Sequence, residues 1–139
     1  MNGHVNEKGR YVCEGTAPDE RTYAMLLHLS LLAHMLLPYI AIIAPLIMWN
    51  MKKKESGYID DHGREAMNFQ ISLLIYSILL PIIAIPIGLL LLGIGVLVTV
   101  PLAAFFPYVL GLVGLIMAAM ASNRGEMYRY PMTIRFLHG

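Results

Sequence analysis

The side chains best suited to chemistry lie inside an uncharged stretch near the N-terminus. His28, Ser30 and His34 all fall within residues 23–49, where no Asp, Glu, Lys or Arg occurs. Two imidazoles could ligate a haem or a metal ion, or relay a proton. His28 and His34 are six residues apart and do not share a helix face, whereas Ser30 and His34 do. For a membrane segment the simpler interpretation, which we favour, places His28 near the interface and lets His34 hydrogen-bond within the bundle.

A second group of polar side chains lies just before the next uncharged stretch. Arg64 and Asn68 are four residues apart and share one helix face, and Asn68 enters a run of apolar residues, where an amide needs a partner. One hypothesis is a polar mouth or gate. The alternative, which we favour, is a helix start at the membrane interface that bonds to the first apolar block. The other members of the group are His62, Glu65 and Gln70.

The distribution of charge shows what kind of element must position these side chains. The chain has 139 residues, of which 58% are hydrophobic, with 10 Lys and Arg and 9 Asp and Glu. Residues 22–51 and 66–123 carry no charge. A soluble domain of this length needs about a quarter charged residues to cover its surface, so the composition excludes a soluble enzyme, a disordered chain and a nucleic-acid-binding module. It predicts an integral membrane protein. The single cysteine, Cys13, excludes an intrachain disulfide.

Block lengths and prolines predict the number of membrane helices. The first block is long enough to span once, but Pro38 lies in its middle, so it either spans as a kinked helix or forms a re-entrant hairpin. The second block is too long for one span and is expected to turn at Gly93 and Gly95, with Pro101 as the alternative position. We therefore predict an all-α integral membrane protein, a bundle of three to four transmembrane helices. Its parts are a flexible polar tail (1–20) and one membrane domain (21–137) with apolar blocks 23–49, 66–92 and 97–122, a polar loop (50–65) and a C-terminal tail (123–139).

The polar loop and the C-terminal tail carry signals of orientation. Lys52, Lys53 and Lys54 follow Trp49, as is typical of the cytoplasmic membrane boundary. We therefore predict a multi-pass protein of the cell inner membrane with loop 50–65 and the C-terminus in the cytoplasm. The side of the N-terminus depends on whether the first block spans or turns back. Asp60 and Asp61 are expected to cap the helix that follows the loop.

Two further patterns suggest contacts rather than chemistry. Small residues at spacings of three and four in the last block form one helix face, which could bind a second copy or pack inside the monomer. Aromatic and basic residues alternate in the C-terminal tail, which predicts anchoring at the lipid headgroups. The packing face comprises Gly111, Gly114, Ala118, Ala121 and Ser122, and the tail residues are Tyr128, Arg129, Tyr130, Pro131 and Arg135.

Four ordered motifs resemble a known family. They read D-E-R-T-Y-A-M-L-L-H-L-S at 19–30, A-P-L-I-M-W at 44–49, D-D-H-G-R-E-A-M-N-F-Q-I-S at 60–72 and R-G-E-M-Y-R-Y-P-M-T-I-R-F at 124–136. They resemble small prokaryotic membrane proteins of a family of unknown function, which are similar to the Tic-twenty subunit of the chloroplast inner-envelope protein translocon. The resemblance implies four helices, and hence a split first block, and a translocation or channel-like role without catalytic residues. His28, Asn68, Tyr130 and Pro131 match its motif positions.

These observations lead to three functional hypotheses. The first is a non-enzymatic, Tic-twenty-like small subunit or scaffold of a membrane complex, or a translocon-like component. The second is a small oligomeric channel or transporter, for which helices broken at prolines would serve. The third is a haem- or metal-binding redox subunit that uses His28 and His34. Under the first hypothesis we expect no cofactor and no nucleic acid, and the partners are the lipid bilayer and further copies or a larger membrane complex.

Overall fold

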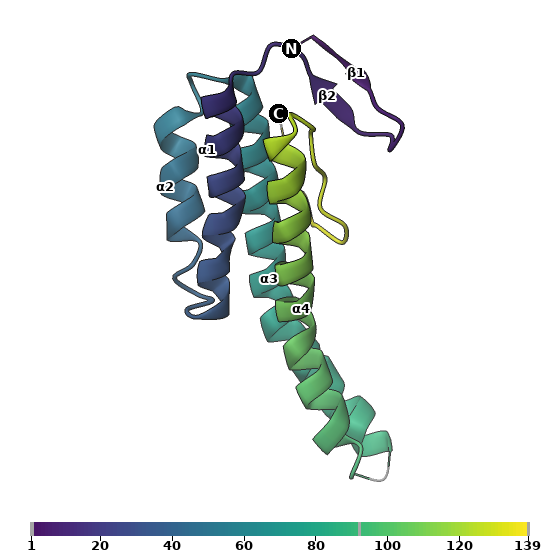
Figure 1. The fold of residues 1–139 in the computed structure, drawn as a ribbon. Helices are drawn as coiled ribbons and strands as arrows, with labels where there is room; N and C mark the ends of the chain where they lie inside the picture. The colour runs from purple at the N-terminus through teal and green to yellow at the C-terminus, as the bar shows by residue number, and fades with distance from the viewer. Residues whose placement is uncertain (1, 92, 139) are drawn as a thin grey trace.

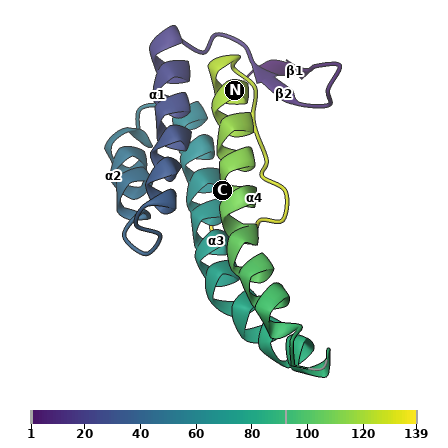
Figure 2. The same cartoon turned by 60° about the horizontal axis from the view of Figure 1, so that its bottom comes forward.

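The computed structural model describes residues 2–91 and 93–138 and shows a mostly helical chain (Figure 1). Two long helices form a hairpin, and the shorter elements gather beside one end of it (Figures 1 and 2). The elements in chain order are β1 (Gly3–Val5), β2 (Tyr11–Cys13), α1 (Pro18–Leu29), the 3-10 helix η1 (Ser30–Met35), α2 (Ile43–Lys52), α3 (Gly57–Leu90) and α4 (Val96–Asn123).

The long hairpin of α3 and α4 has the length and composition to cross a membrane. Among the described residues, these are the two helices that reach the necessary length and hydropathy. Only 17% of the most apolar window in α3, and 11% of that in α4, is buried within the protein, so the apolar side chains face outward. The core helix of a soluble protein would bury such side chains, whereas a lipid-facing helix exposes them. The predicted turn lies between the two helices, with Gly93 at a φ of 76°.

The first apolar block reverses direction instead of continuing as one kinked helix. The chain runs through α1 and η1, turns over residues 36–42 around Pro38, and returns as α2 beside α1 (Figure 1). Within the turn, the amides of Ile40 and Ala41 both donate to the Leu37 carbonyl, at 3.2 and 2.9 Å. With 10 residues, α2 is about 15 Å long, roughly half of the hydrocarbon layer. Of the two alternatives, the structure therefore has the hairpin.

The connection from α2 to α3 is shorter than the predicted loop 50–65. Only residues 53–56 separate the two helices, since α3 already begins at Gly57. Its cap is Ser56, whose extended backbone lets the hydroxyl accept from the Ile59 amide at 3.4 Å. The prediction that Asp60 or Asp61 caps this helix is wrong, because both lie within its first turns and bind other partners.

The N-terminal residues form a β-hairpin where the sequence predicted a flexible tail. β1 and β2 pair antiparallel, and the Asn6 side chain accepts from the Lys8 amide in the turn, at 3.0 Å. The outer edge of β2 binds the C-terminal tail, since the Met127 amide donates to the Tyr11 carbonyl at 2.7 Å. The hairpin is therefore held by residues more than a hundred positions away, which local composition does not reveal.

The core lies where α1, α3 and α4 meet. The five small residues of α4 are all buried within the monomer. A Cβ placed on Gly114 would come within 2.8 Å of the Phe69 ring, and one on Gly111 within 3.1 Å of a Leu73 methyl. In this structure the small-residue face thus lets α4 approach α3, and it is not free to bind a second copy.

Two names are used below for the parts of this fold. The stem is the section of the long hairpin that projects beyond the other elements (Figure 1). We define it as residues 77–90 of α3, which follow the contact of Tyr76 with Met132, and residues 96–107 of α4, which precede the contact of Tyr108 with His34. The head is the rest of the described chain.

Candidate functional site

The head contains a buried chain of hydrogen bonds that links three separate segments. His28 of α1 lies 2.8 Å from His62 of α3 through Nε2, and 2.8 Å from the Tyr130 hydroxyl of the C-terminal tail through Nδ1. All three side chains are almost completely buried. A neutral imidazole donates from one nitrogen and accepts at the other, so His28 donates to one of its two partners and accepts from the other. Both nitrogens of His28 are occupied by protein groups, and neither is left for a metal ion or a haem.

The second histidine of the first block has a different partner. His34 Nδ1 lies 2.8 Å from Gln70 Nε2. His34 Nε2 and Gln70 Oε1 are buried without a hydrogen-bond partner, so this pair is only half satisfied. The structure thus assigns His28 and His34 to separate networks, and the hypothesis that they form one redox site is not supported by their geometry. Ser30 donates to the Leu27 carbonyl at 2.6 Å and serves the local helix.

One face of α3 holds the backbone of the C-terminal tail. Glu65, Asn68, Ser72 and Tyr76 follow at spacings of three, four and four residues, so they form a single stripe. Glu65 Oε1 accepts from the Tyr130 amide at 2.8 Å, and Ser72 Oγ accepts from the Ile134 amide at 2.9 Å. Asn68 Oδ1 accepts from the Phe136 and Leu137 amides at 3.0 and 2.8 Å, and Asn68 Nδ2 donates to the Leu137 carbonyl at 2.9 Å. The Tyr76 hydroxyl donates to the Met132 carbonyl at 2.6 Å.

This stripe makes the tail descend along α3 and return. The tail passes Glu65 at Tyr130, reaches Tyr76 at Met132, and comes back to Asn68 at Leu137. Met132, at the deepest point of this path, has a φ of 56°. Ser72 and Tyr76 were not singled out from the sequence, although polar residues at helical spacing in an apolar run were the available signal.

The sequence predicts that the aromatic side chains of the tail anchor it at the lipid headgroups, but in the structure two of them pack inside the head. Tyr128 and Tyr130 are buried, and the Tyr130 ring stacks on Phe69 with centroids 3.8 Å apart. Burial raises the pKa of the Tyr128 hydroxyl. The prediction of anchoring at the headgroups is therefore wrong for both tyrosines, because α1 and α3 offer them a packed interior. Pro131 is exposed just before the deepest point of the tail.

Ion pairs tie the C-terminal tail and the β-hairpin to the rest of the head. Arg129 binds Asp61 with both terminal nitrogens, at 2.5 and 2.7 Å, and this raises the pKa of the guanidinium. Arg135 lies 3.3 Å from Glu65. Glu126 accepts from Arg124 and from Arg10 of the β-hairpin. The hydrogen bond from Arg124 is the main reason why the pKa of Glu126 falls to about 2.

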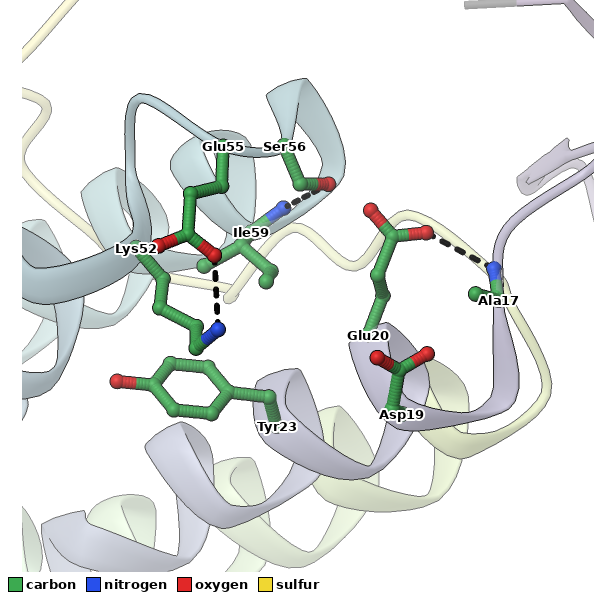
Figure 3. Close-up of a pocket in the computed structure, with 8 residues that line it drawn as sticks. All are labelled: Ala17, Asp19, Glu20, Tyr23, Lys52, Glu55, Ser56 and Ile59. Atoms are coloured by element: carbon green, nitrogen blue, oxygen red, sulfur yellow. Dashed lines mark hydrogen bonds and ion pairs between the residues drawn. The ribbon is translucent and has the colours of Figure 1, made fainter.

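The lysine-rich connection borders a polar pocket of about 340 Å³ (Figure 3). Figure 3 shows Lys52 Nζ above the Tyr23 ring and next to Glu55. Lys52 Nζ donates to a Glu55 carboxylate oxygen at 2.7 Å. Glu20 accepts from the Ala17 amide at 2.8 Å and so caps α1. Asp19 is exposed beside it. Two of the three carboxylates are thus already bonded within the protein. The described residues contain no group of three or more His, Cys, Asp or Glu side chains able to hold a metal ion.

The remaining residues of the predicted loop site pack around Trp49. The indole donates to Asp60 at 2.8 Å, and Asp60 also binds Arg64 at 2.7 Å. Lys53 lies 4.8 Å above the indole ring, and Lys54 is exposed. The loop residues therefore form a charged surface on the head, supported by an aromatic side chain, rather than an enclosed site.

Comparison with known proteins identifies a family. The model of the MamF/MmsF family, described as the magnetosome magnetite crystal formation protein family, matches residues 19–137, and the chain therefore belongs to it. No curated protein and no solved structure matches the chain. The assignment to a Tic-twenty-like family is wrong, because the matching family covers the same residues that suggested the resemblance.

Proposed function

We propose that this chain, a member of the magnetosome magnetite crystal formation family, contributes to that process as a non-enzymatic subunit or scaffold within the membrane. The stem anchors the protein in the bilayer, and the charged surface of the head binds further copies or other membrane proteins. The polar groups of the head support a structural role, because the buried histidines, Asn68 and Glu65 hold segments of the chain together.

The observation that carries this proposal is the one-sided distribution of charge. Every Lys, Arg, Asp and Glu lies in the head or its connections, whereas residues 66–123 carry none. The turn that joins α3 to α4 is likewise uncharged. A protein built this way presents a contact surface on one side of the membrane and only a short apolar turn on the other.

The same distribution supports an orientation. With the first block folded back, all 10 Lys and Arg residues lie on the head side. Basic residues favour the cytoplasmic side. We therefore place the head, including both termini and the lysines at 52–54, in the cytoplasm, with α3 and α4 as the two helices that cross the cell inner membrane.

A channel is less well supported by the same geometry. Such a channel would need polar side chains at its mouth, but Asn68 is bonded to the tail backbone and Gln70 to His34. The interface between α3 and α4 is filled by the small residues of α4 and their neighbours. We therefore give the scaffold hypothesis precedence over the channel hypothesis.

Complementation with crosslinking tests the proposal. In a magnetite-forming host that lacks this gene, the wild-type chain should restore crystal size in electron micrographs, and mild crosslinking should trap it with further copies or a defined partner. The variant Lys53→Gln/Lys54→Gln should lose the crosslinked species and alter crystal size. Lys8→Gln, which removes an exposed charge from the β-hairpin, is the matched control.

Two results would contradict the proposal. Crystals of the same size with and without the gene would remove the role in crystal formation. Recovery of the wild-type chain as a monomer, at native abundance and after verified crosslinking, would remove the role as a subunit.

A further inference from the structure

The stem is shorter than the hydrocarbon layer of a bilayer. From Ser77 to Leu90 the stem contains 14 helical residues, which at 1.5 Å each give about 21 Å. The hydrocarbon layer is about 30 Å thick. If the uncharged turn after Leu90 lies at the far interface, the layer reaches back along α3 to about Ile71. The lowest part of the head must then lie within the membrane.

Two apolar tips of the head lie at this depth. The first is the turn of residues 36–42. It follows directly on Met35, whose terminal methyl lies near Gly111 and therefore level with Leu73. The second is the lowest part of the C-terminal tail, where Met132 meets Tyr76. Both tips end part-way along the long hairpin, and the stem continues beyond them (Figure 1).

Both tips expose apolar side chains that water would disfavour. In the first tip, Leu36 is 83% exposed and Tyr39 66% exposed, and Leu37 and Ile40 are also exposed. In the second tip, Met132 is 58% exposed. A groove of about 380 Å³ beside the first tip is lined only by alanine, leucine and isoleucine side chains. Neither the turn of residues 36–42 nor the stem contains a charged residue. Both tips adjoin the start of the stem, since Met132 bonds Tyr76, the residue before Ser77, and the stem continues beyond the turn of residues 36–42 (Figure 1).

We propose that both tips insert into the acyl chains of the head-side leaflet, so that the head lies partly within one leaflet and does not rest above it. The occupant of the apolar groove is then a lipid acyl chain. Continuity with the lipid-facing stem, and the length that the stem lacks, both point to this occupant. The inference does not depend on a role in crystal formation.

Several backbone groups of the two tips are hydrogen-bonded within the protein, as the acyl-chain region requires. Irregular backbone in hydrocarbon is tolerated only when its polar groups are bonded within the protein. In the first tip, the Leu37 carbonyl accepts two amide hydrogens of the turn. In the second, Ser72 and Tyr76 bond the backbone of Ile134 and Met132. In the second tip, the polar stripe of α3 thus supplies two hydrogen bonds to the tail backbone that water would otherwise make, although the buried Thr133 hydroxyl has no hydrogen-bond partner.

Spin-label depth measurements on the full chain in lipid vesicles test the proposal. Cys13 is the only cysteine, so Cys13→Ala gives a background for single labels. Nitroxides at Leu37→Cys and Met132→Cys report the two tips, while Lys54→Cys on the head and Ile83→Cys in the stem serve as aqueous and deep controls. The measured quantity is the ratio of accessibility to oxygen and to a water-soluble nickel chelate.

The proposal gives a definite order of depths. Both tip labels should be protected from the nickel chelate and lie between the two controls, about 8 Å below the headgroup boundary. Tip labels as accessible to the chelate as Lys54→Cys would overturn the proposal. A Leu37→Cys label at the far interface would overturn it too, because the first block would then cross the membrane. Trp49 fluorescence unchanged from the wild type confirms that each variant has folded.

Discussion

The hydrogen bond between Tyr130 and His28 is expected to contribute measurably to the stability of the head. The substitution Tyr130→Phe removes only the hydroxyl oxygen. The stacking on Phe69, at a centroid distance of 3.8 Å, and the shape of the buried ring are retained. His28 Nδ1, which lies 2.8 Å from that hydroxyl, is left without its partner in a site that is 0% exposed.

The size of the effect follows from this burial. A hydrogen bond between neutral groups contributes about 1 kcal/mol, but a buried group left unpaired costs about 1–3 kcal/mol. We therefore expect Tyr130→Phe to lower the free energy of unfolding of the head by about 2 kcal/mol, roughly a thirtyfold change in the equilibrium constant. Tyr39→Phe, at an exposed tyrosine, should change it by less than about 0.5 kcal/mol.

The single tryptophan provides the assay. Trp49 lies in the head against Gly63, so its fluorescence follows unfolding of the head while the stem remains in detergent. Denaturant titrations of the wild type and both phenylalanine variants give the free energies. A double-mutant cycle with His28→Leu then isolates the pair, and we expect a coupling energy of at least about 0.5 kcal/mol.

One outcome would refute this reasoning. If Tyr130→Phe were as stable as Tyr39→Phe and showed no coupling to His28, the hydroxyl would contribute nothing to the buried chain. The tail would then be held by its backbone bonds to α3 and β2, its ion pairs and the stacking on Phe69.

Three further predictions follow from the head and its tips. Because the folded-state pKa of Glu126 lies near 2, below its usual 4.5, its ion pairs with Arg124 and with Arg10 of the β-hairpin should contribute fully above about pH 4.5 and be lost as the pH falls toward 2. The protection factors of the β-hairpin amides against hydrogen exchange should fall over that range, and Glu126→Gln should abolish the change. Because one polar atom of His34 and one of Gln70 are buried without a hydrogen-bond partner, the double variant His34→Leu/Gln70→Leu should have a higher melting temperature than either single variant. A melting temperature of the double variant lowered by the sum of the two single effects would contradict this. Because insertion into one leaflet makes a membrane protein sensitive to curvature, the wild type should be enriched in small over large vesicles. The variant Leu37→Ser/Met132→Ser should lose that enrichment. Equal partitioning of the wild type between the two vesicle sizes would count against insertion of the tips.

The long hairpin was largely predictable from the sequence, because it depends on local hydropathy. The predicted blocks are 66–92 and 97–122, and the observed helices are α3 over Gly57–Leu90 and α4 over Val96–Asn123. The predicted turn at Gly93 lies between them, and this glycine has a positive φ. The early start of α3 was missed because its first turns are polar and look like a loop. They are helical because Ser56 caps them and the head buries one side.

The head was much less predictable, because its contacts join distant parts of the chain. Tyr130 meets His28 across 102 positions, and Glu126 meets Arg10 across 116. The alternation of aromatic and basic residues fits a tail anchored at the lipid interface as well as it fits a tail packed against the head. Only the polar stripe of α3, which bonds the tail backbone, distinguishes the two arrangements. The orientation of the chain and its partners stay predictions.

The late position of Tyr130 in the chain has a consequence for biosynthesis. His28, His62 and the whole of the long hairpin leave the ribosome before Tyr130 does, so the anchor can enter the membrane while the head still lacks its last segment. Until the tail arrives, His28 and the polar stripe of α3 have open bonding positions. A copy cut short after α4 would therefore stay inserted but incompletely closed, a form that cellular quality control could recognise by its exposed polar stripe.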